Sequence, residues 1–192
     1  MKSFAVDSPK SRQFTPQHAI QNNQVYDEVE VKSLAVDGQN IEKVSFIDSQ
    51  VSGGSWAAAE MTESLLRRTV IKGVRMSGLV AHTLVAENIE FIECKLDMAN
   101  LRSGKFKNVI FIDCVLTESD FQGSSFINVR FSNCDIDRLS VNNCTFSNVD
   151  MRSSKFTDLQ GASSLKGVTM SREQLIMLAP VLANEIGIIV EA

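Results

Sequence analysis

The sequence predicts an all-β solenoid built from coils of twenty residues, and three observations lead to this fold class. From Val31 to Phe156 every fifth residue is apolar. A second row, two positions earlier, prefers small or slim residues, and residues twenty positions apart tend to match. The five-residue spacing fits neither the helical period of 3.6 nor the strand period of 2. A fixed repeat of this kind indicates units that stack on one another.

Composition places the chain among soluble single domains. It has 192 residues, of which 44% are hydrophobic and 22% charged, with a formal net charge of -4. No stretch approaches the ~20 apolar residues of a membrane helix, and the first 25 residues lack the apolar core of a secretory signal. We therefore expect a cytoplasmic protein. Its mildly acidic balance predicts no direct binding to nucleic acid or to a membrane.

Three segments follow from the pattern. Residues 1–25 are rich in Gln, Asn and Ser and are expected to form a polar N-terminal arm that folds back on the first coil. Residues 26–165 hold the repeat, and residues 166–192 hold a C-terminal cap. All three prolines lie outside the repeat, as expected for a ladder that needs its backbone N–H groups.

Stacked coils place matching residues in columns. Neighbouring strands lie ~4.8 Å apart, so rings in a column pack face to face and amides hydrogen-bond along it. The expected core ladders are Phe91, Phe111 and Phe131; Phe106, Phe126 and Phe146; and Cys94, Cys114 and Cys134. The expected amide ladder is Asn88, Asn108, Asn128 and Asn148. The section 53–86 departs most from the pattern, because Trp56 and Met61 are large and Ala81 and Ala86 are small, which predicts local bulging or thinning.

Four pentads carry a more specific signature. They are Ala99-Asn100-Leu101, Ser119-Asp120-Phe121, Cys134-Asp135-Ile136 and Val149-Asp150-Met151. In these residues, and over roughly residues 26 to 160, the chain resembles the pentapeptide-repeat family. The resemblance implies a right-handed quadrilateral parallel β-helix in which four pentads make one coil. About six to seven coils then form a rod roughly 31 Å long.

The sequence of the C-terminal segment predicts a helical cap. After Gly161 the register drifts by one residue to Leu165 and Met170. The run Ser171-Arg172-Glu173-Gln174 is a capping box, and the following helix carries one apolar face. That face includes Leu175, Leu178, Leu182 and Ile186. Pro180 is expected to kink the helix, Gly187 to end it, and residues 188–190 to add a short strand.

The same helix leaves two oligomeric states open. If its leucines only plug the last coil, we expect a monomer. If residues 186–190 remain exposed, we expect two rods to join end to end as a homodimer.

For each candidate catalytic or metal-binding residue, we favour a structural or solvent-exposed role. His18 lies in the arm and His82 at an outward position, without the partner and cleft that a general base needs. A straight column of inward thiols suits core packing better than tetrahedral metal ligation. Three carboxylate pairs, Glu90 with Glu93, Glu118 with Asp120, and Asp135 with Asp137, lie on a convex rod that offers no shared cleft. We therefore predict no enzyme, no cofactor and no metal.

Two uses of such a rod remain. The first is a rigid protein-interaction scaffold with an unknown partner. The second is implied by one branch of the family, which mimics DNA, binds DNA gyrase or a related type II topoisomerase, and protects it from quinolones or toxins. Residues 31–160 hold 16 Asp or Glu and 14 Lys or Arg, a net charge of -2. A duplex mimic should present a continuous negative stripe, so the scaffold is the main hypothesis and gyrase the alternative.

A candidate contact surface lies in the middle of the repeat. Ile92 and Ile112 are expected to stack at outward positions, with Ile110 beside them and Val115 around the corner. Cover by the arm, through Phe4, Phe14 or Ile20, explains these residues equally well.

Overall fold

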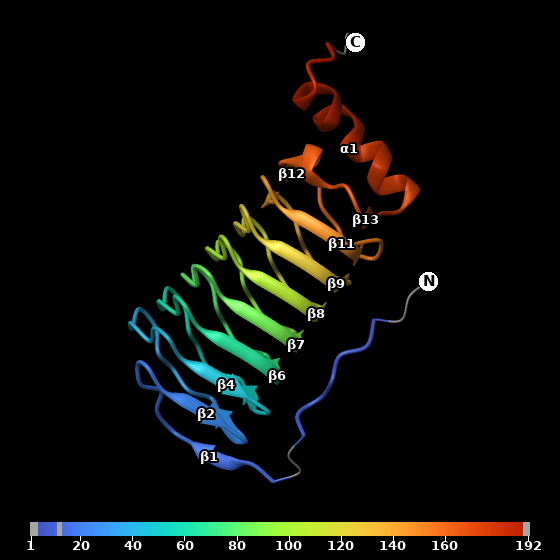
Figure 1. Cartoon of the computed structure of the whole chain (residues 1–192). Coiled ribbons are helices and arrows are strands. Elements are labelled where there is room, and N and C mark those ends of the chain that lie inside the picture. The colour runs from blue at the N-terminus through green and yellow to red at the C-terminus, as the bar shows by residue number, and fades with distance from the viewer. Residues whose placement is uncertain (1–3, 11–12, 190–192) are drawn as a thin grey trace.

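The computed structural model, which describes residues 4–10 and 13–189, is a parallel β-solenoid of about seven turns with a C-terminal helix (Figure 1). The predicted fold class is therefore confirmed. Strands succeed one another along the rod from β1 at one end to β13 near the helix, as Figure 1 shows. In the described part of the chain, no helix is long and apolar enough to span a membrane.

Two adjoining sides of the rod, here called the strand sides, hold the regular strands. In the middle coils both sides run as one eight-residue strand. On either side of the corner residue, residues pair in parallel with those twenty positions on, as Phe106 does with Phe126. The strands of these sides are β2 (Val25–Asp27), β3 (Val29–Lys32), β4 (Ser45–Ile47), β5 (Gln50–Ser52), β6 (Leu65–Lys72), β7 (Val85–Ile92), β8 (Lys105–Ile112), β9 (Ser125–Ser132) and β11 (Thr145–Asp150).

The other two sides, here called the bridge sides, are joined mainly by isolated parallel bridges. Glu60 pairs with Val80 and Arg75 with Lys95, again at a spacing of twenty residues. Near the C-terminal end two short strands, β10 (Leu139–Ser140) and β12 (Leu159–Gln160), form on these sides. The twenty-residue register therefore holds on all four sides.

A left-handed residue sits in the middle of each long strand where two sides meet. Asn88, Asn108 and Asn128 have φ of 57°, 53° and 55°. Asn adopts this region several-fold more often than most residues, and Gly adopts it freely. Gly73 and Gly123 fill equivalent turns with φ of 63° and 72°. The chain thus places Asn and Gly where the backbone must turn a corner.

The apolar rows fill the interior of the rod. Phe91, Phe111 and Phe131 stack with ring centroids 4.9 Å apart, and Phe106, Phe126 and Phe146 stack at 5.0 and 5.1 Å. All six rings belong to the packed core, although Phe146, in the last long strand, is only half-buried. Such offset stacks add to the stabilisation that burial itself gives.

The section 53–86 keeps its register, contrary to the bulging or thinning expected there. β6 and β7 pair without interruption, and Trp56 and Met61 point inward with exposed fractions of 1% and 2%. The small Ala81 and Ala86 are also fully buried. Because large and small residues share the same length of rod, their volumes compensate and the coil does not have to deform.

The ladder starts earlier than residue 26. β1 (Thr15–Gln17) pairs in parallel with β3, so part of the expected arm is an edge strand. Pro16 fits this edge for a geometric reason. Val70, at the equivalent place in a later coil, donates its N–H to the preceding coil at Ser49 O, 3.1 Å away. At Pro16 the missing N–H would point out of the end of the solenoid, where proline also discourages further strand pairing.

Residues 4–10 do not fold back on the first coil, which corrects that expectation. They run beside the rod towards its C-terminal half, as Figure 1 shows. Ile20 is 8% exposed and joins the core, and Phe14 is half-buried. The physical reason is that the arm has partners along the rod, at Asp48 and at Arg130.

The C-terminal end closes with a 3-10 turn η1 (Ala162–Ser164), β13 (Val168–Thr169) and α1 (Arg172–Glu185). β13 pairs with β11 at an offset of nineteen residues, which confirms the one-residue drift. The capping box between Ser171 and Gln174 is present, and α1 continues through Pro180. Gly187, with φ of 81°, follows the helix.

The short terminal strand was a wrong prediction for Ile188 and Ile189. Neither residue is in a strand, and they are 56% and 86% exposed. Val190 lies outside the described residues. The strand has no edge to join, because Gln174 of α1 already donates to the carbonyls of Met151 and Ser154 at 2.8 and 2.7 Å.

Candidate interaction surfaces

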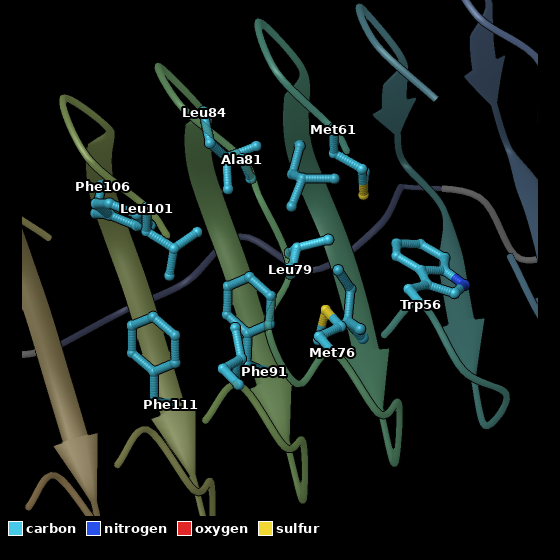
Figure 2. A pocket seen from close by; sticks show the side chains of 13 residues that line it. Trp56, Met61, Met76, Leu79, Ala81, Leu84, Phe91, Leu101, Phe106 and Phe111 are labelled. Atoms are coloured by element: carbon cyan, nitrogen blue, oxygen red, sulfur yellow. The ribbon is translucent and has the colours of Figure 1, made fainter. Parts of the chain in front are cut away.

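The interior of the rod holds a void of about 10 Å³, too small for a ligand. Figure 2 shows the apolar side chains around it, among them Trp56, Met61, Ala81 and Phe106. A space of this size accommodates about one water molecule, and water needs polar partners. The Nε1 of Trp56 is buried and has no hydrogen-bond partner within residues 4–10 and 13–189. Any binding by this protein therefore has to use its outside.

The cysteine column is fully buried, and the pKa values of two of its three thiols are raised. The Sγ atoms of Cys94 and Cys114 donate to backbone carbonyls at 3.3 to 3.4 Å. The adjoining thiols raise the pKa of Cys94 far above its usual range and that of Cys114 to about 12. Burial raises the pKa of Cys144 to about 11. The hydrogen bond with Cys114 lowers the pKa of Cys134. Since only a thiolate acts as a nucleophile or metal ligand, the raised pKa values of Cys94, Cys114 and Cys144 favour a packing role for these three thiols.

The other candidate catalytic groups stand apart or are neutralised. His18 is exposed and His82 half-buried. On the bridge sides, Arg102 pairs with Asp120 at 2.6 Å and Lys155 with Asp135 at 3.2 Å. Among the described residues, no group of three His, Cys, Asp or Glu side chains is placed to hold a metal.

Polar ladders cover the strand sides. Glu87 lies between Arg67 at 3.3 Å and Lys107 at 3.0 Å, in one column of alternating charge. In the next column each Asn donates its Nδ2 to the Oδ1 of the Asn one coil earlier. The three distances, from Asn108 to Asn88, Asn128 to Asn108 and Asn148 to Asn128, are 3.0, 3.0 and 2.9 Å. The strand sides thus present charges that cancel and amides that are already paired with each other.

The column of Asn residues begins with an ion pair. Arg68 Nε donates to Asp48 Oδ1 at 2.6 Å, and Asp48 is 7% exposed. This guanidinium lowers the pKa of the Asp48 carboxyl below its usual range. Sequence spacing predicts that these residues stack, because they are twenty apart.

The apolar contact surface proposed from the sequence is less exposed than its positions implied. Ile92 and Ile112 pair on β7 and β8, and they, Ile110 and Val115 are all half-buried. Larger exposed groups lie elsewhere on the rod. They are Val25 of β2, 63% exposed, Met98, 58% exposed, and Ile127, 44% exposed. All three hold outward places in the five-residue pattern, so their exposure was readable from the sequence.

Charge is distributed unevenly around the rod. Over the coils from residue 34 to residue 163, the bridge sides carry ten Asp or Glu and six Lys or Arg. The strand sides of the same coils carry six acidic and seven basic residues. One half of the circumference is therefore acidic and the other nearly neutral, which the overall charge of the repeat does not show.

A hollow interrupts the bridge sides near their middle. It has a volume of about 420 Å³ and includes Arg75, Ser77, Lys95, Asp97 and Val115 in its lining. Met98 lies at its rim, so the hollow combines an exposed apolar group with both charge signs.

The C-terminal end carries the most exposed apolar residues. Of the predicted cap residues, Leu178 is buried at 2% and Leu182 is half-buried, whereas Leu175 is 54% and Ile186 66% exposed. A groove of about 660 Å³ runs between α1 and the segment that leads into it, where Leu165 lies. The helix thus both plugs the last coil and leaves an apolar surface outside.

The family comparison bears on the repeat itself. A family model for the pentapeptide repeat region matches residues 104–175. The chain carries a pentapeptide repeat region. The expected resemblance is therefore confirmed, and the β pairing continues the same twenty-residue register of the pentapeptide repeat back to β2.

Solved structures of pentapeptide-repeat proteins resemble the chain at low identity. Trypsin-treated QnrB1, a plasmid-mediated fluoroquinolone resistance protein, is 17% identical, with a TM-score of 0.44 over 88% of this chain and 91% of that chain. HetL, a pentapeptide repeat protein involved in heterocyst differentiation regulation from the cyanobacterium Nostoc sp. strain PCC 7120, is 11% identical, with a TM-score of 0.29 over 78% and 90%. A comparison with curated proteins found no match.

Proposed function

We propose that this chain is a non-catalytic scaffold whose acidic bridge sides bind the basic surface of a protein partner. The observation that carries the proposal is the uneven charge, ten acidic against six basic residues on two adjoining sides. Summed charge on one face steers a partner of opposite sign and fixes its orientation.

The regular ladder makes this charge pattern rigid. Each coil is hydrogen-bonded to the next through parallel pairs and bridges, for example Asn100 with Asp120. Charged residues on successive coils are thus held about 4.8 Å apart. A rigid surface loses little conformational entropy on binding, which favours recognition by shape and charge together.

DNA gyrase or a related type II topoisomerase is a more specific candidate for the partner. The acidic excess on the bridge sides favours it, because such an enzyme presents a basic surface to DNA. The size of the negative charge, however, favours the broader proposal of a protein scaffold over DNA mimicry. A duplex carries one negative charge per ~1.7 Å, hence about 20 over a rod of seven coils roughly 34 Å long. Ten carboxylates offset by six cations give a much weaker field.

Matched charge reversals test the scaffold. Glu60→Lys with Asp158→Lys changes the bridge sides, and Glu93→Lys with Asp113→Lys makes the same change in net charge on the strand sides. Partner capture from cell extract by the tagged protein should be lost in the first variant and kept in the second. Equal capture by both variants would contradict binding through the bridge sides.

A gyrase assay tests the specific candidate. The protein is titrated into a supercoiling reaction at two salt concentrations, with Phe126→Asp, which buries a charge in the core, as the misfolded control. Inhibition that weakens with salt supports gyrase as the partner. Absence of inhibition removes this candidate and leaves the scaffold proposal to the capture experiment.

We further propose that α1 joins two rods end to end. A dimer is expected if the residues after the helix remain exposed. Ile186, Ile188 and Ile189 are 66%, 56% and 86% exposed. Because this apolar surface lies at one end only, a second copy that uses the same surface gives a closed pair. Equilibrium sedimentation distinguishes the dimer from the monomer.

A further inference from the structure

The N-terminal arm crosses the strands of the rod in an extended conformation. The backbone N–H of Lys10 donates to Asp48 Oδ1 at 3.0 Å, and the Arg130 guanidinium lies 4.4 Å from the centre of the Phe4 ring. Asp48 and Arg130 are four coils apart, a distance of about 19 Å. Six residues span at most about 20 Å, and the side chains of Phe4 and Arg130 bridge part of the distance, so the arm covers it in an extended conformation. Figure 1 shows this path beside the strands.

Side chains of the arm alternate as they do in a docked peptide. Phe4 and Val6 are half-buried, whereas Ala5 and Asp7 are exposed. This period of two is typical of an extended segment with one face against a surface. The charge also matches, because Arg68, whose pKa is raised first by Asp48, is attracted in addition by Asp7.

Few contacts hold the arm in place. Within residues 4–10, Lys10 makes the one hydrogen bond to the rod, and the described backbone there joins no strand. Ordering seven residues costs conformational entropy at each of them. One hydrogen bond, one cation–π contact, one ionic attraction and the partial burial of Phe4 and Val6 oppose that cost. With so few contacts, a segment that binds the same surface more tightly would displace the arm.

The surface beneath the arm, here called the arm seat, offers more than the arm uses. We define the arm seat by Asp48, Arg68, Asn108, Asn128 and Arg130. Each of the two Asn amides uses one N–H in the ladder and retains a second. The Nε of Arg130 is buried and has no hydrogen-bond partner among the described residues. A carbonyl or hydroxyl oxygen placed there would bind a donor that Phe4 leaves unsatisfied.

Space is also present at the Phe4 end of the arm seat. A hollow of about 380 Å³ is lined by Arg130, Ser132, Asp150, Arg152 and Ser153. A larger aromatic side chain than Phe4 can therefore lie against Arg130 and extend into this hollow.

We propose that the arm seat is a peptide-binding surface, which the arm occupies within its own chain and which a partner protein occupies by displacing it. The partner segment is extended and has an aromatic residue, an aliphatic residue two positions later and an acidic residue three positions later, as Phe4, Val6 and Asp7 have. The inference deepens the proposed scaffold function. It gives the strand sides a second contact, separate from the acidic bridge sides.

The probe for this site is a labelled synthetic peptide with the sequence of residues 4–10. Its binding is measured by fluorescence anisotropy to the full chain and to a full chain with Phe4→Ala and Asp7→Ala. The loosened arm no longer competes, so we expect at least tenfold tighter binding to the double variant. Equal affinity for both proteins would show that the arm does not occupy the peptide site, and no binding to the double variant would overturn the site itself.

Substitutions in the double variant locate the peptide. Arg130→Ala should weaken binding at least tenfold, and Arg130→Lys, which keeps the charge beside Asp150 but loses the flat guanidinium, should weaken it less. Arg138→Ala, on the bridge sides, should leave binding unchanged. Circular dichroism confirms that each variant is folded. Equal loss in Arg130→Ala and Arg138→Ala would refute the arm seat.

The two tests can fail separately, because the scaffold proposal depends on Glu60 and Asp158 of the bridge sides and the arm seat depends on Arg130 of the strand sides. Loss of partner capture in both charge-reversed variants together with intact peptide binding would reject only the bridge-side proposal. Failure of peptide binding with normal capture would reject only the arm seat.

Discussion

Replacing Asn128 tests whether the amide ladder stabilises the corner of the rod. The Asn128 side chain donates to Asn108 at 3.0 Å and accepts from Asn148 at 2.9 Å. Its backbone is left-handed, with φ of 55°. Asn128→Ala removes both hydrogen bonds and puts Ala in a conformation it disfavours. Asn128→Gly removes the same bonds but leaves the backbone relaxed, so the pair separates the two effects.

The expected magnitudes follow from these two contributions. Each hydrogen bond contributes about 1 kcal/mol, and water replaces part of it at this half-buried site. The left-handed conformation costs an L-residue such as Ala about 1–2 kcal/mol. We expect Asn128→Ala to lose about 2–3 kcal/mol of the free energy of unfolding. Asn128→Gly should lose about 0.5–1 kcal/mol less, since the added flexibility of Gly in the unfolded chain offsets part of its advantage.

Urea denaturation followed by circular dichroism measures both variants, and thermal melts check them. For a chain of this size, 2–3 kcal/mol corresponds to a fall in Tm of about 4–12 °C. An Ala variant as stable as the Gly variant would refute the backbone argument. A loss below about 0.5 kcal/mol in both would show that the ladder bonds contribute nothing beyond what water supplies.

Four further substitutions test four different interactions. Ala81→Leu should destabilise the protein by about 1–3 kcal/mol in urea denaturation, because the void it faces, about 10 Å³, cannot hold the added carbons; a more stable variant would contradict this. Gln174→Ala removes the side-chain donor from two backbone carbonyls of the last coil, of which Met151 O still accepts from Ser154 N–H, so thermal unfolding should come earlier and light scattering should rise; unchanged scattering would mean that the helix alone protects the edge. Asp48, whose folded pKa is lowered first by Arg68, contributes stability that is present above its unfolded pKa near 4 and is lost as pH falls through the lower folded value. Asp48→Asn should therefore flatten the acid limb of stability against pH, and an unchanged limb would exclude this contribution. Ile186→Lys should convert the end-to-end dimer to a monomer in sedimentation, whereas a monomeric parent protein would refute the dimer.

The repeat could be predicted from the sequence because its rules are local. A residue such as Phe106 needs only a five-residue pattern to be placed inside, and a twenty-residue pattern to be placed above Phe126. The slip to nineteen residues at β13 was readable for the same reason. The Asn residues at one left-handed corner, Asn88, Asn108, Asn128 and Asn148, carried a further local signal.

The contacts of the N-terminal arm and of the C-terminal cap could not be predicted from these local patterns. Nothing local to Phe4 points to Arg130, which lies far away in the sequence and close only after the rod has formed. Similarly, Gln174 was recognised as part of a capping box, but its bonds to the last coil depend on how α1 docks. The uneven charge around the rod is an intermediate case. It can be counted from the sequence alone, but only after each residue has been assigned to a strand side or a bridge side.

The extended arm also relates the length of the N-terminal segment to the number of coils in the rod. Coils contact only their neighbours, so a duplication of twenty residues in the middle of the solenoid would add one coil and lengthen it by about 4.8 Å. The arm already extends between Asp48 and Arg130, and such an insertion would move these two attachment points further apart. Phe4 would then meet the residue one coil short of its present partner. The length of the first ten residues and the number of coils beneath them are therefore tied together, and a change in either one would have to be matched by the other.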